Sequence, residues 1–222
     1  MGNGLALTLS PDNLVKKMRP HYPFTALHIV WSRLDKQAKS LLDVGCGKGD
    51  PMSFINKHGS FDVTGVDLFQ PYLEEAKRKA VYRRLVFGNA LFLPFESKTF
   101  DTVICMELLE HLEEADGNLL LGELERVARK QILLTTPIGR YEQHAYDGNR
   151  YQEHKFIWTI GALRSQGYKI WGTGIRGLPR KEIRSQSIRF FRDGAYALGG
   201  VFSYYLPQLA CHVVAEKKLN SK

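Results

Sequence analysis

The fold is decided by the stretch Leu41-Leu42-Asp43-Val44-Gly45-Cys46-Gly47-Lys48-Gly49-Asp50. Its first four residues form a short, mostly apolar run, which is typical of a buried strand. The three glycines that follow at alternate positions predict a tight turn, because a residue without a Cβ lets the backbone bend sharply and lets a ligand approach closely. A short helix is expected over 51–58, ending at Gly59. The stretch therefore predicts a strand, a glycine turn and a helix.

The same alternation continues on both sides of this unit. Further strands are expected over 63–67, 85–87, 100–105, 131–135, 168–172 and 210–216. Helical patterns cover 12–36 (broken at Pro20 and Pro23), 72–80, 115–128 and 158–166. Strands that alternate with helices favour a parallel sheet with helices on both faces. Ligands of such sheets bind beyond the carboxyl ends of the strands, so the loop after the first strand is where a cofactor is expected.

Two carboxylates accompany the glycine loop. The spacing G-x-G-x-G differs from the dinucleotide pattern G-x-G-x-x-G and from phosphate-binding loops. Asp43, two residues before the first glycine, is suited to a cation such as the amino group of a methionine moiety. Asp67, at the end of the next strand, can accept hydrogen bonds from both hydroxyls of a ribose. The alternatives are plain turn glycines and, for Asp67, a helix N-cap.

A set of further motifs follows this loop at matching positions. They are Gly65-Val66-Asp67-Leu68, Gly88-Asn89-Ala90, Leu93-Pro94-Phe95, Phe100-Asp101 and Glu110-His111-Leu112. Together with DVGCGKG at 43–49, they resemble the class I methyltransferases that use S-adenosylmethionine, and among them the small-molecule "methyltransferase type 11" group. The resemblance covers about residues 40–137. It implies an α/β three-layer sandwich with a mostly parallel seven-stranded sheet, an antiparallel last strand and helices on both faces.

The resemblance also implies a cofactor site for S-adenosylmethionine, with S-adenosylhomocysteine as product and no metal. The expected cofactor-binding residues are Asp43, Gly45, Cys46, Gly47, Gly49, Asp67, Leu68, Asn89, Ala90, Met106 and Glu107. In this family pattern, Asp43 and the loop backbone hold the methionine portion. Asp67 binds the ribose diol, and Leu68 packs against adenine.

The adenine and sulfonium ends complete the implied site. The Asn89 side chain would accept a hydrogen bond from the adenine amino group, although the family more often has an aspartate there. The backbone N–H of Ala90 would donate to an adenine ring nitrogen. Met106 or Glu107, just after the fourth strand, would lie near the sulfonium and the methionine amine.

Three histidines are candidates for a general base: His111, His144 and His154. His111 follows the fourth strand, and the other two lie in the segment after Pro137, which varies with substrate in the family. A base is needed only if the acceptor must lose a proton. Each histidine can instead be a structural hydrogen bonder. The same segment is rich in aromatic residues that either line an acceptor pocket or pack internally, namely Tyr141, Tyr146, Tyr151, Phe156 and Trp158.

The charge is concentrated in the last third of the chain. The net charge is +8, and residues 140–222 carry all of the excess, with 14 Lys and Arg against 6 Asp and Glu. A basic face attracts nucleic acid, an anionic lipid surface or an acidic small substrate, unless it is simply solvated. The first expectation is methyl transfer to an O, N or C atom of a small-molecule or lipid-like acceptor. The alternatives are an RNA or protein methyltransferase and a non-catalytic cofactor-binding subunit.

The 222 residues are expected to form a single domain. Its parts are a cofactor-binding core over about 38–137, a variable acceptor or lid segment over about 138–207 and a last strand over about 209–217. No apolar run reaches the roughly 20 residues of a membrane helix, and the first residues do not resemble a signal peptide. The three cysteines are widely spaced, which favours a cytoplasmic location. Peripheral membrane contact through 203–209 and the oligomeric state stay open.

Overall fold

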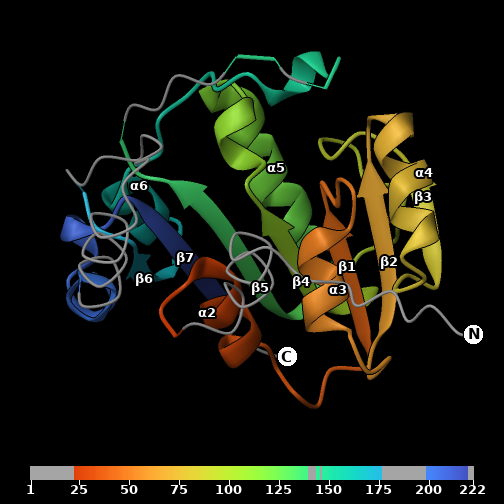
Figure 1. Ribbon diagram of the computed structural model, residues 1–222, viewed down its shortest axis with the longest axis horizontal. Helices are drawn as coiled ribbons and strands as arrows, with labels where there is room; N and C mark the ends of the chain where they lie inside the picture. Colours follow the sequence, from red (N-terminus) through yellow and green to blue (C-terminus); the bar gives the residue numbers. More distant parts are fainter. Residues whose placement is uncertain (1–22, 140–143, 146, 177–198, 220–222) are drawn as a thin grey trace, which may run out of the picture.

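A seven-stranded sheet forms the middle layer of the computed structural model, which describes residues 23–139, 144–145, 147–176 and 199–219 (Figure 1). The strands are β1 (Ser40–Val44), β2 (Asp62–Asp67), β3 (Arg84–Phe87), β4 (Phe100–Met106), β5 (Ala128–Pro137), β6 (Lys169–Thr173) and β7 (His212–Lys218). Their order is β3-β2-β1-β4-β5-β7-β6. The pairs among β1 to β5 are parallel, and β7 runs antiparallel to both β5 and β6. The expected seven-stranded sheet with an antiparallel last strand is confirmed.

Helices lie on both sides of this sheet (Figure 1). The α-helices with assigned bounds are α2 (Ala26–Arg33), α3 (Asp50–Ile55), α4 (Gln70–Arg78), α5 (Glu114–Val127) and α6 (Ile160–Ser165). Short 3₁₀ turns are η2 (Leu109–His111), η3 (Arg150–Gln152) and η4 (Pro207–Leu209). The three-layer arrangement is thereby confirmed. Within the part of the chain that is described, no helix has the length and apolar character needed to cross a bilayer.

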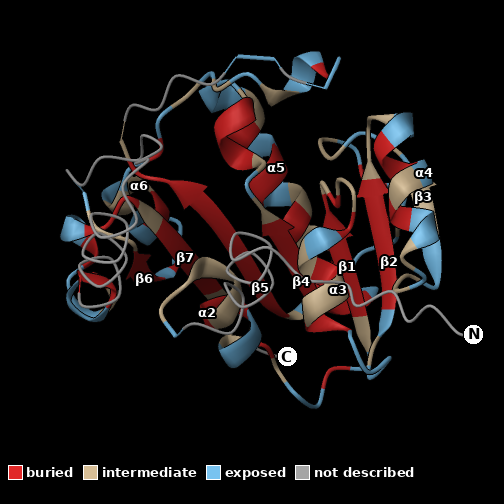
Figure 2. Ribbon diagram, viewed as in Figure 1, coloured by how far each residue is buried: buried red, intermediate tan, exposed pale blue. Residues whose placement is uncertain are grey.

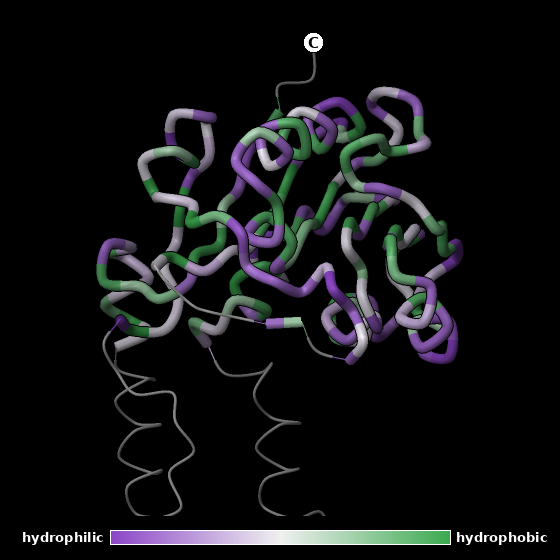
Figure 3. Tube along the Cα trace, turned by 90° about the horizontal axis from the view of Figure 1, so that it is seen from above, coloured by the Kyte–Doolittle hydropathy of each residue, from purple (hydrophilic) through white to green (hydrophobic). Residues whose placement is uncertain are grey.

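The core consists of two apolar clusters, one on each face of the sheet. Successive strand residues point to opposite faces, so Leu41 packs with α2 and α3 whereas Leu42 packs with α5. Ile104 and Val103 divide between the same two clusters. Since both faces are covered, β1 and β4 are buried almost throughout (Figure 2). Hydrophilic stretches lie mainly on the outer turns (Figure 3).

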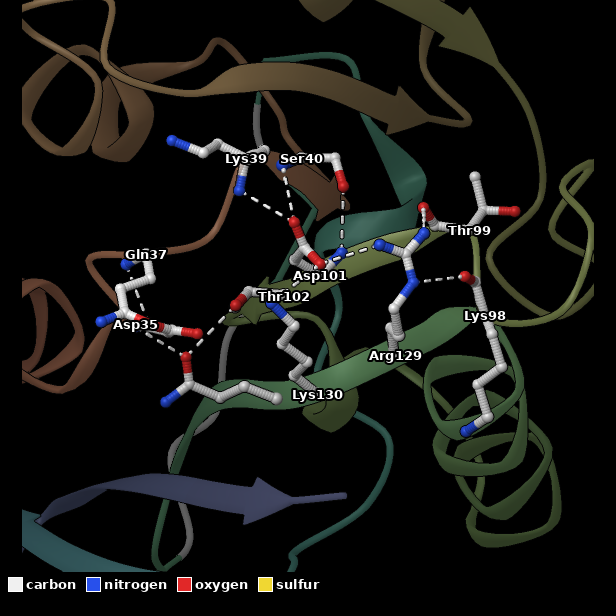
Figure 4. A network of polar contacts seen from close by, with 11 residues as sticks. Asp35, Gln37, Lys39, Ser40, Lys98, Thr99, Asp101, Thr102, Arg129 and Lys130 are labelled. Atoms are coloured by element: carbon white, nitrogen blue, oxygen red, sulfur yellow. Dashed lines mark hydrogen bonds and ion pairs between the residues drawn. The ribbon is translucent and has the colours of Figure 1, made fainter. Parts of the chain in front are cut away.

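A polar network ties together the amino-terminal ends of β1 and β4 and the start of β5 (Figure 4). The Asp101 carboxylate accepts hydrogen bonds from the backbone N–H groups of Lys39 (2.8 Å) and Ser40 (3.3 Å). It also pairs with Arg129 at 2.9 Å and Lys130 at 3.4 Å. Burial opposes its ionisation, but these bonds and the Lys130 charge hold the pKa of Asp101 below its ordinary value. The Phe100-Asp101 motif is therefore structural and lies at the edge of the sheet away from the glycine loop.

Two expected element boundaries are wrong. The helix expected over 158–166 begins at Ile160, because the Thr159 hydroxyl accepts the backbone N–H of Ala162 and caps the helix. Trp158 stands before the helix and is buried in the core. The last strand begins at His212 and not at 209 or 210, because η4 turns the chain just before it. The expected helical segment 12–36 is described only from residue 23, and its first part lies outside the described residues.

Candidate cofactor and acceptor site

The glycine loop lies at the switch point of the sheet. From β1 the chain builds outward to β2 and β3 on one side and to β4 and β5 on the other, and ligands of such sheets bind where these directions part. The backbone N–H groups of Gly45 and Cys46 both donate to the carbonyl of Val66, at 2.8 and 3.0 Å. At Gly47, φ is +51° and a Cβ would meet nothing within 4 Å. The loop is thus held down on β2 while its backbone stays open at Gly47.

Asp43 is a buried carboxylate directly beneath this loop. Its side chain is 4% exposed, and the Tyr82 hydroxyl donates to its Oδ2 at 2.7 Å. Burial raises the pKa of Asp43 to about 7; the hydrogen bond from Tyr82 opposes this shift, and the nearby Asp67 adds to it. A cation would relieve the cost of this buried charge. Asp43 is therefore suited to bind the ammonium group that the sequence analysis predicts as its partner.

Tyr82 was missed by sequence reasoning. It stands in the turn before β3, outside every motif, and its ring occupies the space beside two glycines. A Cβ would come within 2.8 Å of this ring at Gly49 and within 2.9 Å at Gly65. Such contacts are not tolerated, so these two glycines make room for Tyr82. Gly49, expected to bind cofactor, thereby has a packing role in the structure.

Asp67 lies at the end of β2 with its carboxylate turned toward the loop. Oδ2 accepts the backbone N–H of Gly47, and Oδ1 accepts that of Phe69, both at 2.8 Å. The N-cap position of α4 is Phe69, so the N-cap alternative for Asp67 is wrong. Each carboxylate oxygen keeps a second lone pair, which leaves capacity for hydroxyl donors. Leu68 is half-buried beside it.

Asn89 and Ala90 follow β3 at the same edge of the sheet. The Asn89 side chain is exposed, and its Oδ1 accepts the backbone N–H of Leu91 at 3.0 Å. The amide oxygen expected to meet adenine thus already closes a local turn, although it retains a second lone pair. Ala90 is half-buried and packs against the core.

Met106 ends β4, and Glu107 turns away from it with a left-handed φ of +52°. Its carboxylate accepts the Thr135 hydroxyl at 2.7 Å and lies 3.4 Å from Nε2 of His212. Burial opposes ionisation of Glu107, but the contact with His212 lowers its pKa. Burial likewise opposes the charge on His212, but Cys211 and Glu107 outweigh it and raise its pKa to about 9. His212 was also missed, because only the antiparallel β7 brings it to this edge.

Glu110, His111 and His154 form a second cluster just beyond β4. Glu110 and His111 lie on η2 and are 2% and 7% exposed. The rings of His111 and His154 are 4.9 Å apart between centroids. Burial lowers the pKa of His111, whereas burial and the charge of Glu107 raise the pKa of Glu110. At neutral pH, His111 can therefore accept a proton or a metal ion.

The structure brings together two of the three candidate histidines. His144 is exposed, its neighbours 140–143 and 146 lie outside the described residues, and the ligand cluster found among the described residues does not include it. Of the aromatic set, Trp158 donates its indole N–H to the carbonyl of Leu109 and belongs to the core. Tyr151 is 43% exposed. Tyr141 and Tyr146 are not among the described residues.

The segment that carries His154 is fixed to the core by its backbone. The N–H groups of Lys155 and Phe156 donate to the carbonyl of Glu110, at 2.9 and 3.3 Å. Further upstream, Lys48 of the glycine loop pairs with Asp147 at 2.8 Å. Residues 147–156 are thus joined to both the cofactor loop and the end of β4.

Comparison with known proteins identifies the family. The model of a methyltransferase domain matches residues 41–131. O-methyltransferase resE of Aspergillus sclerotiorum is 34% identical over 207 residues, which cover 86% of this chain and 76% of that protein. The chain belongs to the class I methyltransferases, which use S-adenosylmethionine.

Other relatives of this methyltransferase match over a shorter length. Ubiquinone biosynthesis O-methyltransferase of Coxiella burnetii is 32% identical over 108 residues, which is 46% of this chain and 46% of that protein. The match thus spans about half the length of such relatives.

A solved structure covers nearly the whole chain. Magnesium protoporphyrin IX methyltransferase of Synechocystis PCC 6803, solved with bound S-adenosylmethionine, superposes with a TM-score of 0.55 at 17% identity over 99% of this chain and 87% of that one. At this identity the likeness supports the fold.

Proposed function

We propose that this class I methyltransferase transfers a methyl group from S-adenosylmethionine to an oxygen atom of a small-molecule acceptor. The proposal is carried by two carboxylates, Asp43 and Asp67, that flank the open backbone of Gly47 at the switch point of the sheet. The choice of oxygen is supported by relatives that are named O-methyltransferases. Lipid-like acceptors are an outcome that the acceptor screen below distinguishes, and identification of the labelled product separates oxygen from nitrogen and carbon.

The residues present fit the cofactor. Asp43 would hold the methionine ammonium, since its buried carboxylate needs a cation. Asp67 would hold the ribose hydroxyls through its remaining lone pairs. Gly47 leaves the backbone accessible, and any side chain there would be strained at its positive φ. Asn89 and Ala90 would lie at the adenine end.

The cofactor supplies an activated methyl group on a sulfonium, so the protein has no difficult bond to activate itself. Its task is to align the acceptor oxygen with the methyl carbon, and such positioning is worth about 7–11 kcal/mol. Residues 147–156 would hold the acceptor, and their contacts with the glycine loop and with the end of β4 support this. A hydroxyl acceptor must also lose its proton, and His111 and His154 stand next to one another for that role.

Cofactor binding is tested by thermal unfolding with S-adenosylhomocysteine. A ligand at 100 times its dissociation constant stabilises by about 2.7 kcal/mol, which raises the melting temperature of a chain of this size by about 5–10 °C. Asp67→Ala is expected to lose most of this shift. Asp62→Ala is the matched control, because Asp62 starts the same strand but pairs with the exposed Arg83. Equal shifts in both variants would contradict the cofactor assignment.

The acceptor is tested with a labelled methyl group and cell extract separated into lipid, nucleic-acid and small-metabolite fractions. Label is expected in small metabolites, with little dependence on salt. Label in RNA, lost steeply as salt rises through release of counterions, would instead support the nucleic-acid alternative. If S-adenosylhomocysteine binds but no fraction yields it as product, the chain is a non-catalytic cofactor-binding subunit.

A further inference from the structure

Three side chains beyond β4 present metal-binding atoms to one another. One carboxylate oxygen of Glu110 and one ring nitrogen each of His111 and His154 all lie within 4.8 Å of one another. Two of these residues are adjacent on η2, and the third comes from a segment 43 positions further along the chain. Two imidazoles and one carboxylate form the donor set that binds Fe²⁺ in the facial triads of oxygenases and Zn²⁺ in many hydrolytic sites.

Outer contacts already orient two of the three donors. Nδ1 of His111 is 3.1 Å from the carbonyl oxygen of Glu153. A carbonyl can only accept, so Nδ1 carries the proton and Nε2 is the nitrogen with a lone pair for an ion. Metal-binding histidines are held in this way by backbone carbonyls. On the carboxylate, the Thr136 hydroxyl donates to Oε2 of Glu110 at 3.1 Å.

The third donor is held in place by its own backbone neighbours. The segment that carries His154 is bound to η2 by three contacts. The N–H groups of Lys155 and Phe156 donate to the Glu110 carbonyl, and the Glu153 carbonyl accepts from the His111 ring. Ligand atoms around one ion stand about 3.4 Å apart when metal–nitrogen distances are near 2.1 Å. His154 is only half-buried, so its side chain can close the remaining gap.

We infer that Glu110, His111 and His154 form a binding site for a divalent first-row transition ion, such as Zn²⁺, Mn²⁺ or Fe²⁺. Imidazole nitrogen selects these ions over Mg²⁺, which prefers oxygen ligands and retains its water. Three protein ligands leave coordination positions open for an exogenous oxygen. The inference departs from the sequence-based expectation that the protein uses no metal.

The site has a role in the reaction if the proposed function holds, and this part of the inference rests on it. An ion held next to the end of β4 would coordinate the acceptor hydroxyl and lower its pKa, as bound divalent ions do for water. The acceptor oxygen then gives its proton to water and forms a bond to the methyl carbon while the sulfur–methyl bond breaks. The products are a methyl ether and S-adenosylhomocysteine. In this scheme His111 and His154 hold the ion, which replaces the general-base role proposed for them above.

Cobalt is the direct probe of this site. The full-length protein, freed of metal by a chelator and dialysed, is titrated with Co²⁺ and followed by its visible absorption, which reports nitrogen and oxygen ligands independently of turnover. One Co²⁺ per chain is expected, with the bands reversed by Zn²⁺ and unaffected by millimolar Mg²⁺. His154→Gln should weaken binding by on the order of 100-fold, since losing even an outer partner of a ligand costs about 10–100-fold.

The matched control is His58→Gln, because His58 is exposed in the turn after α3, away from the cluster. Glu110→Gln is the second variant, since it keeps the acceptor for Thr136 while removing the ligand charge. The inference is overturned if wild-type protein shows no Co²⁺ bands, or if His58→Gln and His154→Gln weaken binding equally. Thermal shifts with S-adenosylhomocysteine on the same samples separate the two proposals. Cofactor binding without Co²⁺ bands rejects only the metal site, whereas Co²⁺ bands without cofactor binding reject only the proposed function.

Discussion

Asp43 combines its proposed binding role with a cost to the free protein. Its carboxyl is buried, and among the described residues the Tyr82 hydroxyl is the side chain that donates a hydrogen bond to it. Because the folded pKa is raised from 3.8 to about 7, the folded state holds a proton that the unfolded chain releases. Stability of the cofactor-free protein therefore falls as pH rises from about 4 through about 7.

Asp43→Asn is expected to stabilise the cofactor-free protein at pH 8. The pKa displacement of Asp43 to about 7 corresponds to about 4 kcal/mol, and the new amide N–H groups cost about 1–3 kcal/mol where they lack acceptors. The net gain is about 1–3 kcal/mol, and it shrinks as pH falls toward 4. Thermal unfolding at pH 5 and pH 8 measures it. The same variant should lose its response to S-adenosylhomocysteine; a destabilised variant at pH 8 would contradict the argument.

The affinity for S-adenosylhomocysteine is expected to rise with pH and to level off above about 7. Only the ionised form of Asp43 attracts the ammonium group, so affinity should change by up to tenfold per pH unit below its pKa of about 7. Burial raises the pKa values of the neighbouring Cys46 and Tyr82 far above this range, so both stay neutral. Burial also raises the pKa of Asp67, so protonation of this second carboxyl adds to the loss of affinity at low pH. Calorimetry from pH 5.5 to 8.5 checks the profile, and Asp43→Asn should flatten most of it.

Sequence reasoning at this scale reached the residues whose positions follow from local spacing. Asp43, the glycines and Asp67 sit at strand ends, and a strand end is visible in the sequence. Tyr82 and His212 could not be found in this way. Tyr82 meets Asp43 from 39 positions away, and His212 reaches Glu107 only because β7 inserts between β5 and β6. Contacts of this kind depend on topology and leave no local pattern.

At the scale of elements, α5 comes very close to Trp158 at one glycine. Gly117 on this helix faces the indole of Trp158, and an added Cβ would come closer to the ring than real Cβ atoms do. Gly122, one and a half turns later, is exposed and has nothing within 4 Å of such a Cβ. The two glycines of one helix thus differ in purpose.

The pair predicts opposite effects of the same substitution. Gly117→Ala is expected to destabilise by about 1–3 kcal/mol, because overpacking forces Trp158 or the helix to shift. Gly122→Ala should stabilise by about 0.5–1 kcal/mol through helix propensity alone. Urea unfolding of both variants gives the difference. If Gly117→Ala left the free energy of unfolding unchanged, the segment around Trp158 would be shown to shift at little energetic cost.

The types of the elements were predictable because strand and helix periodicities are strong in this chain. The residues at which the elements begin and end were less predictable. The capping hydroxyl of Thr159 belongs to a residue type that favours N-caps, so a signal for the start of α6 was present. The turn η4 before β7 had only Pro207 to mark it. The segment proposed to hold the acceptor was the least predictable, because residues 147–156 are positioned by long-range bonds to Lys48 and Glu110.

At the scale of the whole molecule, the order of the sheet links the two ends of the described chain. β7, which lies near the carboxyl terminus, inserts between β5 and β6, so β6 reaches the rest of the sheet only through β7. The same strand contributes His212 to the site and Val214 to the cluster around α2. β6 therefore belongs to the same sheet as the strands of the glycine-loop core, and Trp158 and Trp171, which follow Pro137 in the chain, belong to the same two apolar clusters.

This sharing predicts a single cooperative unfolding transition. Trp31 is near the start of the described chain, Trp158 packs on α5 and Trp171 lies in β6, so tryptophan fluorescence samples both halves. The urea midpoints from fluorescence and from far-ultraviolet circular dichroism should coincide. S-adenosylhomocysteine should move both midpoints together, although its proposed site lies only at the ends of β1, β2, β3 and β4. Two separated transitions, with only one shifted by the ligand, would mean that residues after Pro137 fold as a unit of their own and that the acceptor segment is not coupled to the cofactor core.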